Sequence, residues 1–316
     1  MRMNFDVPEI QRSAIGGLLH STGQLIDAEA DPYLLSSGAI ALPADSGVRG
    51  ARIVNAVLGL VHVRSERRVG SALRASRAEL EVMRCDDARS IAVHDMVIAM
   101  ADFALGEASP LDLQRRVAKA RMMWDDALMV SCALLITLHS GEVMQARTLA
   151  NEALAMYGDH PMVLRQVVEV YKSTLDFPAA IAALQMLHQR TDELGGSWAS
   201  LQDDIEILSD LADRADAHDF DTEGLLGRIR TAIDVIRARE HTIFSIALTH
   251  RYARKAALEI EIDGGFNRCF KTRTRLLRVL DERFAESTSD VLSICCRRSI
   301  AHLPGDFADL RHPRLI

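Results

Sequence analysis

Three charged residues at helical spacing, Arg165, Glu169 and Lys172, form the clearest set of side chains that could bind another molecule. Side chains three and four positions apart lie on the same face of a helix. Their signs alternate along that face, which suits a charged groove that receives a peptide or a partner helix. The same pattern also fits a solvated helix face that its own ion pairs stabilise.

Residue types that carry catalysis or bind metals form no recognisable arrangement in the sequence. The eleven histidines are dispersed, and His241 and His250 lack the four-residue spacing that places two ligands on one helix face. The five cysteines include no Cys-x-x-Cys pair, so we expect reduced and mostly buried thiols. We therefore predict no catalytic residue, no metal and no cofactor.

Basic residues are concentrated late in the chain. Positions 1–220 carry 20 basic and 31 acidic side chains, a balance of −11, whereas positions 221–316 carry 17 and 13, a balance of +4. A cluster of this kind could contact the phosphates of a nucleic acid, but acidic residues interrupt it and no groove-reading motif accompanies it. We expect a solvated helix face, or attraction to the acidic half of the chain, rather than a nucleic-acid partner.

The elements that would position these residues are two helical hairpins, at Ala127–Tyr157 and Pro161–Arg190, whose starts are offset by 34 residues. Small residues recur in phase at Ala146 and Ala180, where an antiparallel partner helix must approach closely. Tight turns fall at matching places in the two hairpins, 140–142 and 175–177. A period of this size predicts an array of helix–turn–helix units.

This region resembles the tetratricopeptide repeat family over about 100 residues, roughly 92–190. The residues that carry the resemblance are Gly141, Ala146, Ala153, Leu154, Leu164, Tyr171, Asp176, Phe177 and Ala180. Val130 and Leu134 stand where the family has its tryptophan and its first-helix glycine. The resemblance implies an α-solenoid whose first helices line a concave face, and it would place Arg165, Glu169 and Lys172 there. The alternative is a generic helical bundle with regular loops.

The segments around the repeats are also expected to be mainly helical. Residues 1–90 form a helical region with a breaker-rich loop at 31–50. Residues 196–258 are expected to form long connecting helices, of which the last runs from His241 to Leu258. Within the array, Met122, Met123 and Met129 are expected to fill core space.

The C-terminal segment, 259–316, contains Ile262, Gly264, Asn267 and Arg268 around a Gly-Gly turn, an apolar run at 291–296, and a His-x-x-Gly-Asp pattern that ends at Asp306. These features resemble the start of a GGDEF domain, the diguanylate cyclase family. The resemblance implies a small α or α/β module in which Asn267 and Asp306 lie near a guanine nucleotide.

The same segment departs from the family where catalysis would occur. Arg297 and Arg298 follow the expected strand directly, in place of the Asp-x-Asp that helps to hold magnesium. Two cations at that point remove the electrostatic basis of phosphoryl transfer. The signature Gly-Gly-Asp/Glu-Glu-Phe turn does not occur in the sequence. We therefore expect a truncated, degenerate module without cyclase activity, and chance similarity is the alternative.

Composition favours a mostly α protein, because the chain is 48% hydrophobic, 26% charged and only 5% aromatic. No apolar run reaches the roughly 18 residues of a membrane span, and no secretory signal is recognisable. We expect a cytoplasmic, bacterial-type scaffold or regulator that binds a partner protein or peptide, with no membrane partner. Alternatives are a GTP or cyclic di-GMP sensor and a helical accessory protein of a secretion system; homodimerisation is left open.

Overall fold

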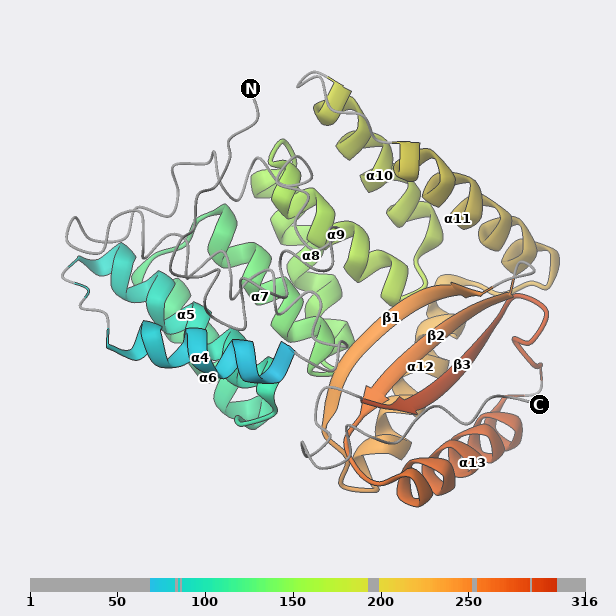
Figure 1. Ribbon diagram of the computed structural model, residues 1–316. Coiled ribbons are helices and arrows are strands. Elements are labelled where there is room, and N and C mark those ends of the chain that lie inside the picture. Colours follow the sequence, from blue (N-terminus) through green and yellow to red (C-terminus); the bar gives the residue numbers. More distant parts are fainter. Residues whose placement is uncertain are drawn as a thin grey trace. The chain divides into compact units, whose positions relative to one another are not determined.

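The computed structural model describes residues 69–82, 85, 87–192, 199–251, 255–284 and 286–299. Ten helices and three strands make up this described part, so the predicted mostly α class is confirmed, with a small sheet in addition (Figure 1). The predicted loop at 31–50 and the helices around it lie outside the described residues. The chain divides into two compact units, Met1–Ser109 with Ser299–Ile316, and Pro110–Arg298.

The first unit contains α4 (Val69–Glu81) and α5 (Ala88–Leu105), which pack against each other. Asp87 caps the start of α5, because its carboxylate accepts a 2.9 Å hydrogen bond from the Ser90 N–H. Gly106 ends this helix in the left-handed conformation, with φ of 70°. An ion pair between Arg77 and Asp102 joins the two helices.

The second unit begins with a run of helices. They are α6 (Pro110–Met123), α7 (Ala127–His139), α8 (Val143–Tyr157), α9 (Pro161–Ser173), α10 (Phe177–Asp192), α11 (Ala199–Ala217) and α12 (Thr222–Arg237). Each helix from α7 to α10 packs against the next one along the chain, and α7 also packs against α9. The side chains from Leu128 to Leu138 are all buried, so neighbouring elements cover most of the surface of α7.

The two predicted hairpins, α7–α8 and α9–α10, have turns that match residue by residue across the 34-residue offset. Gly141 and Leu175 occupy the same position and both have positive φ, 89° and 58°. In both turns the residue before them, Ser140 or Thr174, donates its hydroxyl to the carbonyl three positions earlier. The repeated geometry shows that both hairpins turn in the same way, although one turn contains glycine and the other leucine.

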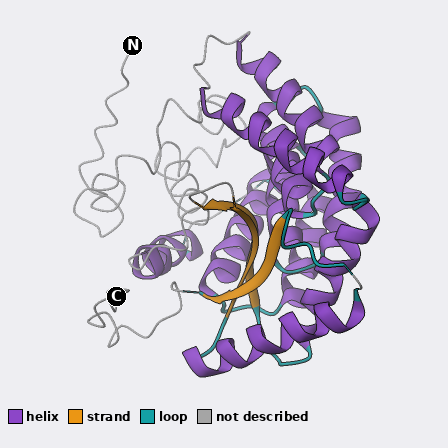
Figure 2. Cartoon of the chain, turned by 90° about the vertical axis from the view of Figure 1, so that its right-hand side faces the viewer, coloured by secondary structure: helices purple, strands orange, loops and turns teal. Residues whose placement is uncertain are grey.

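A three-stranded sheet follows the helices. It consists of β1 (Ile243–Arg251), β2 (Lys255–Ile262) and β3 (Leu292–Arg298) in that order, with β1 antiparallel and β3 parallel to β2. The crossover from β2 to β3 is α13 (Phe266–Arg283), which packs against β3 and against α12. Figure 2 shows the three strands as a curved sheet beside the helices. The apolar run at 291–296 thus lies largely in a strand, and this strand also includes Arg297 and Arg298, which were expected to follow it.

The predicted helix from His241 to Leu258 is wrong, because these residues lie largely in β1 and in the first half of β2. The physical reason is that apolar residues recur at every second position, which is the spacing of one face of a strand. Leu258, Ile260 and Ile262 face the core, and Glu259 and Glu261 alternate with them. Isoleucine-rich segments with this alternation favour a strand over a helix. In the described part of 196–258, the helices are therefore α11 and α12, and the third expected helix is replaced by strands.

The edge of the sheet is attached to the repeats at one residue of β1. The Ile246 N–H donates to Nδ1 of His139 at 3.1 Å, and the Ser173 hydroxyl donates to the Ile246 carbonyl at 3.2 Å. His139 and Ser173 are the last residues of α7 and α9, and they are 34 positions apart. The two repeats thus use equivalent positions to satisfy both backbone groups of one edge-strand residue.

Candidate interaction surface

A cavity of about 490 Å³ opens on the surface of the second unit between α6 and α8. Its lining includes Ala133 and Thr137 of α7, which are one helical turn apart and have short side chains. Because α6 and α8 both pack against α7, these short side chains leave a groove between the two flanking helices. We call this the α6–α8 groove. The further apolar residues that line it are Val117, Ala118, Met122 and Leu149.

The rim of the α6–α8 groove is polar but carries little net charge. Gln114 and Gln145 contribute uncharged amides. Arg121 and Asp125 form a two-armed ion pair, in which Nε and Nη2 of the arginine donate to the two carboxylate oxygens at 2.8 and 2.9 Å. The hydrogen bond to Asp125 raises the pKa of Arg121. The groove therefore suits an apolar guest with a few hydrogen-bonding groups, rather than an ion.

Met122 is the residue on which the sequence prediction for this surface fails. We expected it to fill core space, but its side chain is 84% exposed beside the groove, whereas Met129 is fully buried as expected. The unbranched, polarisable methionine side chain adapts to guests of irregular shape. The signal in the sequence was the run 122–124, two methionines and a tryptophan at the end of a helix, which is unusual for a solvated terminus.

The predicted partner-binding residues on α9 lie away from the α6–α8 groove. Lys172 is only 12% exposed, and its Nζ lies 3.2 Å from Glu169 and 3.2 Å from Asp204 of α11. Burial lowers the pKa of Lys172, but attraction to the two carboxylates outweighs it, so the pKa is raised. Lys172 therefore joins α9 to α11. Arg165 and Glu169 are half-buried, and their role in binding a partner stays a prediction.

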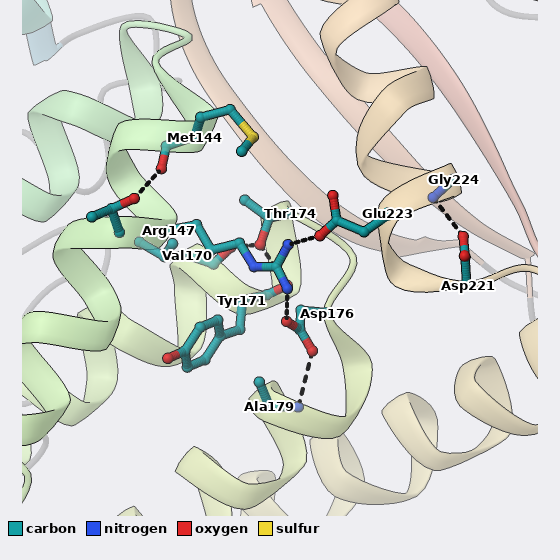
Figure 3. A network of polar contacts seen from close by, with 11 residues as sticks. Met144, Arg147, Val170, Tyr171, Thr174, Asp176, Ala179, Asp221, Glu223 and Gly224 are labelled. Atoms are coloured by element: carbon teal, nitrogen blue, oxygen red, sulfur yellow. Dashed lines mark hydrogen bonds and ion pairs between the residues drawn. The ribbon is translucent and has the colours of Figure 1, made fainter.

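A second polar network holds the repeats to α12 (Figure 3). Arg147 of α8 donates to Asp176, in the turn before α10, at 2.8 Å and to Glu223 of α12 at 2.7 Å. Burial lowers the pKa of Arg147, and the two acids more than compensate, so the pKa is raised. Asp176 also accepts from the Ala179 N–H and so caps α10. Arg147, Asp176 and Glu223 therefore join helices of this protein to one another.

A buried histidine near the Gly-Gly turn has the geometry of a catalytic triad without access to a substrate. Nδ1 of His241 faces an Asp263 carboxylate oxygen at 3.0 Å, and Nε2 lies 2.8 Å from the Thr272 hydroxyl. Both His241 and Thr272 are buried. A substrate could not reach the hydroxyl, so the cluster fastens the turn at Gly264, with φ of 108°, to α13.

Of the two predicted nucleotide-contact residues of the cyclase-like segment, the structure describes only Asn267. Asn267 is exposed in the first turn of α13, and Asp306 lies outside the described residues. Arg297 of β3 pairs with Glu259 at 2.9 Å and with Glu261 at 2.6 Å. Both glutamates are buried, so the guanidinium supplies them with a counter-charge.

The cysteines are free thiols. Burial raises the pKa of Cys132 to about 12 and that of Cys296 to about 11, which keeps both protonated near neutral pH. Among the described residues, no cluster of three or more histidine, cysteine or acidic side chains is arranged to hold a metal ion.

No protein-family model, curated protein or solved structure matches this chain. Among the described helices, none has both the length and the apolar character that would be needed to cross a bilayer.

Proposed function

We propose that this protein is a tetratricopeptide-like scaffold that binds an apolar segment of a partner protein in the α6–α8 groove. The observation that carries this proposal is the groove itself: about 490 Å³ of open space with apolar walls and a rim formed by two amides and one mutually paired arginine and aspartate. A groove of this size and chemistry accommodates two or three apolar side chains from one face of a helix.

The repeat geometry supports the proposed solenoid arrangement. First helices α7 and α9 pack together, second helix α8 packs against α9, and the turns repeat at a 34-residue period. These are the neighbour relations of a stacked hairpin array. Beyond α11 the stacking ends, because α12 packs against α13 and β3. The array is thus short, and its α6–α8 side offers the groove.

The proposed role of the C-terminal segment is structural rather than catalytic. Arg297, which lies in β3 near the place where the cyclase family has a metal-binding acid, is held by Glu259 and Glu261. Releasing it to admit a cation would leave two buried carboxylates without this guanidinium. We therefore propose a cyclase-like module without cyclase activity, which covers the ends of the repeats through β1.

The proposed function is tested by photo-crosslinking in the native cell extract. A photo-reactive benzoylphenylalanine at Gln145, on the rim of the groove, should capture a discrete partner. Ala118→Glu places a carboxylate against the apolar wall and should lower the yield of that adduct about tenfold, because burying an unpaired charge costs more than 1.4 kcal/mol.

The matched control is Ala155→Glu, an exposed position of α8 that does not line the groove. It should leave the adduct unchanged. The proposal fails if Gln145 captures nothing, or if Ala118→Glu and Ala155→Glu have equal effects. Thermal unfolding followed by circular dichroism shows whether each variant is folded.

A further inference from the structure

α13 presents a stripe of apolar side chains to solvent in addition to the face that it buries. Cys269, Thr272 and Leu276 are its buried residues. On another side, Phe266, Phe270 and Leu277 are 72%, 60% and 45% exposed. The two phenyl rings stack on each other, with centroids 6.3 Å apart and planes inclined by 16°. Single exposed apolar residues are ordinary, but three aligned along one helix indicate a contact surface.

The same helix is strongly basic. It carries six basic and two acidic residues, a net charge of +4, in a chain whose net charge is −7. Arg268 anchors the helix by donating to the carbonyls of Arg239 and Glu240. The other cations near the stripe are exposed and form no ion pair with any residue that the structure describes; they are Lys271, Arg273, Arg275 and Arg278. Their positive charge favours binding to an anionic partner.

We propose that α13 binds the surface of a membrane that contains anionic phospholipids. At such a surface the Phe266–Phe270–Leu277 stripe would enter the boundary between headgroups and acyl chains, while the flanking cations contact phosphates. Helical spacing of 3.6 residues per turn puts Arg273 in line with the stripe, between Phe270 and Leu277, and puts Lys271, Arg275 and Arg278 together about a third of a turn around the helix from it. This separation of an apolar edge from a basic face is typical of helices that lie in the interface.

The geometry favours lipid over a single-stranded nucleic acid. Nucleic-acid platforms use aromatic rings whose faces are open to bases. Here the two rings stack on each other, and the stripe continues with the aliphatic Leu277, which offers no surface for base stacking. Figure 1 shows α13 at the outer side of its unit, beyond the sheet and α12. The proposal goes beyond partner binding in the groove and departs from our expectation of no membrane partner.

The test is co-sedimentation of the full-length protein with vesicles. One set contains phosphatidylserine and phosphatidylcholine in equal parts, and the other contains phosphatidylcholine alone. We expect sedimentation with the anionic vesicles only, and a loss of binding as salt rises. Lys271→Gln/Arg275→Gln/Arg278→Gln should weaken partitioning about a hundredfold, and Phe266→Ser/Phe270→Ser about tenfold.

Two matched controls carry the same kinds of change elsewhere. Arg115→Gln/Arg230→Gln/Arg239→Gln removes three other exposed cations, and Leu111→Ser/Met156→Ser removes two other exposed apolar side chains that do not line the groove. Both should bind as the wild type does, and unchanged thermal unfolding shows that the α13 variants are folded. Absence of binding to the anionic vesicles overturns the proposal, as does equal loss in the controls. The proposal is also overturned if the protein does not bind vesicles but shifts single-stranded RNA in a gel, provided that this shift is salt-sensitive and requires Lys271, Arg275 and Arg278.

Discussion

Lys172 shows how one buried cation can hold two helices together. Its ammonium lies 3.2 Å from Glu169 on the same helix and 3.2 Å from Asp204 on α11. A lysine is seldom as buried as this unless it is paired, because desolvation of the charge is costly. We infer that Lys172 stabilises the α9–α11 contact, whatever else this face of α9 does.

This pairing predicts a pH-dependent stability. Lys172→Met should lower the free energy of unfolding by about 1 kcal/mol at pH 7, since the acids then lose their partner. The folded-state pKa is raised. The stability from Lys172 is therefore fully present below the unfolded pKa, about 10.4, and is lost as pH rises through the folded pKa. Urea unfolding at pH 7 and above pH 11 measures this difference.

The matched control for Lys172 is Lys271→Met, which removes an exposed lysine that forms no ion pair with the described residues. Its effect on the free energy of unfolding should stay within about 0.5 kcal/mol at both pH values. An equal loss in the two variants, or a Lys172→Met deficit that persists at high pH, would contradict a stabilising ion pair.

At the scale of elements, the turns between paired helices depend on residues that accept positive φ. Gly141 has φ of 89°, and a Cβ atom there would lie 3.0 Å from Cδ1 of Ile243 and 3.1 Å from Nη2 of Arg237. Leu175 adopts positive φ at the equivalent position of the second hairpin. Its buried side chain offsets the conformational cost of about 1–2 kcal/mol.

Gly141→Ala should lower the free energy of unfolding by about 1–2 kcal/mol, from the left-handed conformation and from crowding against β1. Gly227→Ala is the comparison, because Gly227 lies inside α12 and a Cβ there meets no atom within 4 Å. That change should raise the free energy of unfolding by up to about 1 kcal/mol. Chemical denaturation of both variants checks the opposite signs, and a stabilising Gly141→Ala would refute the strained turn.

Local signals explain which elements could be predicted from the sequence. The hairpins were found because Asp126 and Pro161 mark helix starts and because the 34-residue offset repeats. The β1–β2 hairpin was missed, although Phe244, Ile246 and Leu248 are buried and alternate with half-buried neighbours as they do in a strand. Its pairing and its attachment to the helix ends are long-range contacts that short sequence windows do not contain.

The candidate site was harder to predict than the fold. The alternating charges on α9 were visible, but Asp204, which pairs with Lys172, is 32 residues away in a different helix. The α6–α8 groove depends on how α6 packs on α7 and on the short side chains of Ala133 and Thr137. Neither feature has a sequence pattern of its own. Only the exposed Met122 gave a local sign of the surface.

At the scale of the whole molecule, the repeats and the sheet of the second unit share one hydrophobic core. Buried residues from Val130 of α7 to Cys296 of β3 form a single cluster, and Ile246 lies within it. Ile246 also donates its N–H to His139 and accepts a hydrogen bond from the Ser173 hydroxyl at its carbonyl. A core that spans both parts should unfold as one cooperative unit, because neither part keeps its apolar face covered without the other.

Ile246→Val is the sharpest probe of this coupling, because it removes one buried methylene and leaves the backbone hydrogen bonds in place. The loss should be about 1 kcal/mol, so amides that exchange only through global unfolding should exchange about fivefold faster. This acceleration should appear equally in α9 and in β2 when hydrogen exchange is followed by mass spectrometry. Val82→Ala, at an exposed position of the first unit, should leave both segments unchanged. Faster exchange in β2 alone would mean that the sheet unfolds independently of the repeats, and that the contacts at Ile246 join two separately stable parts.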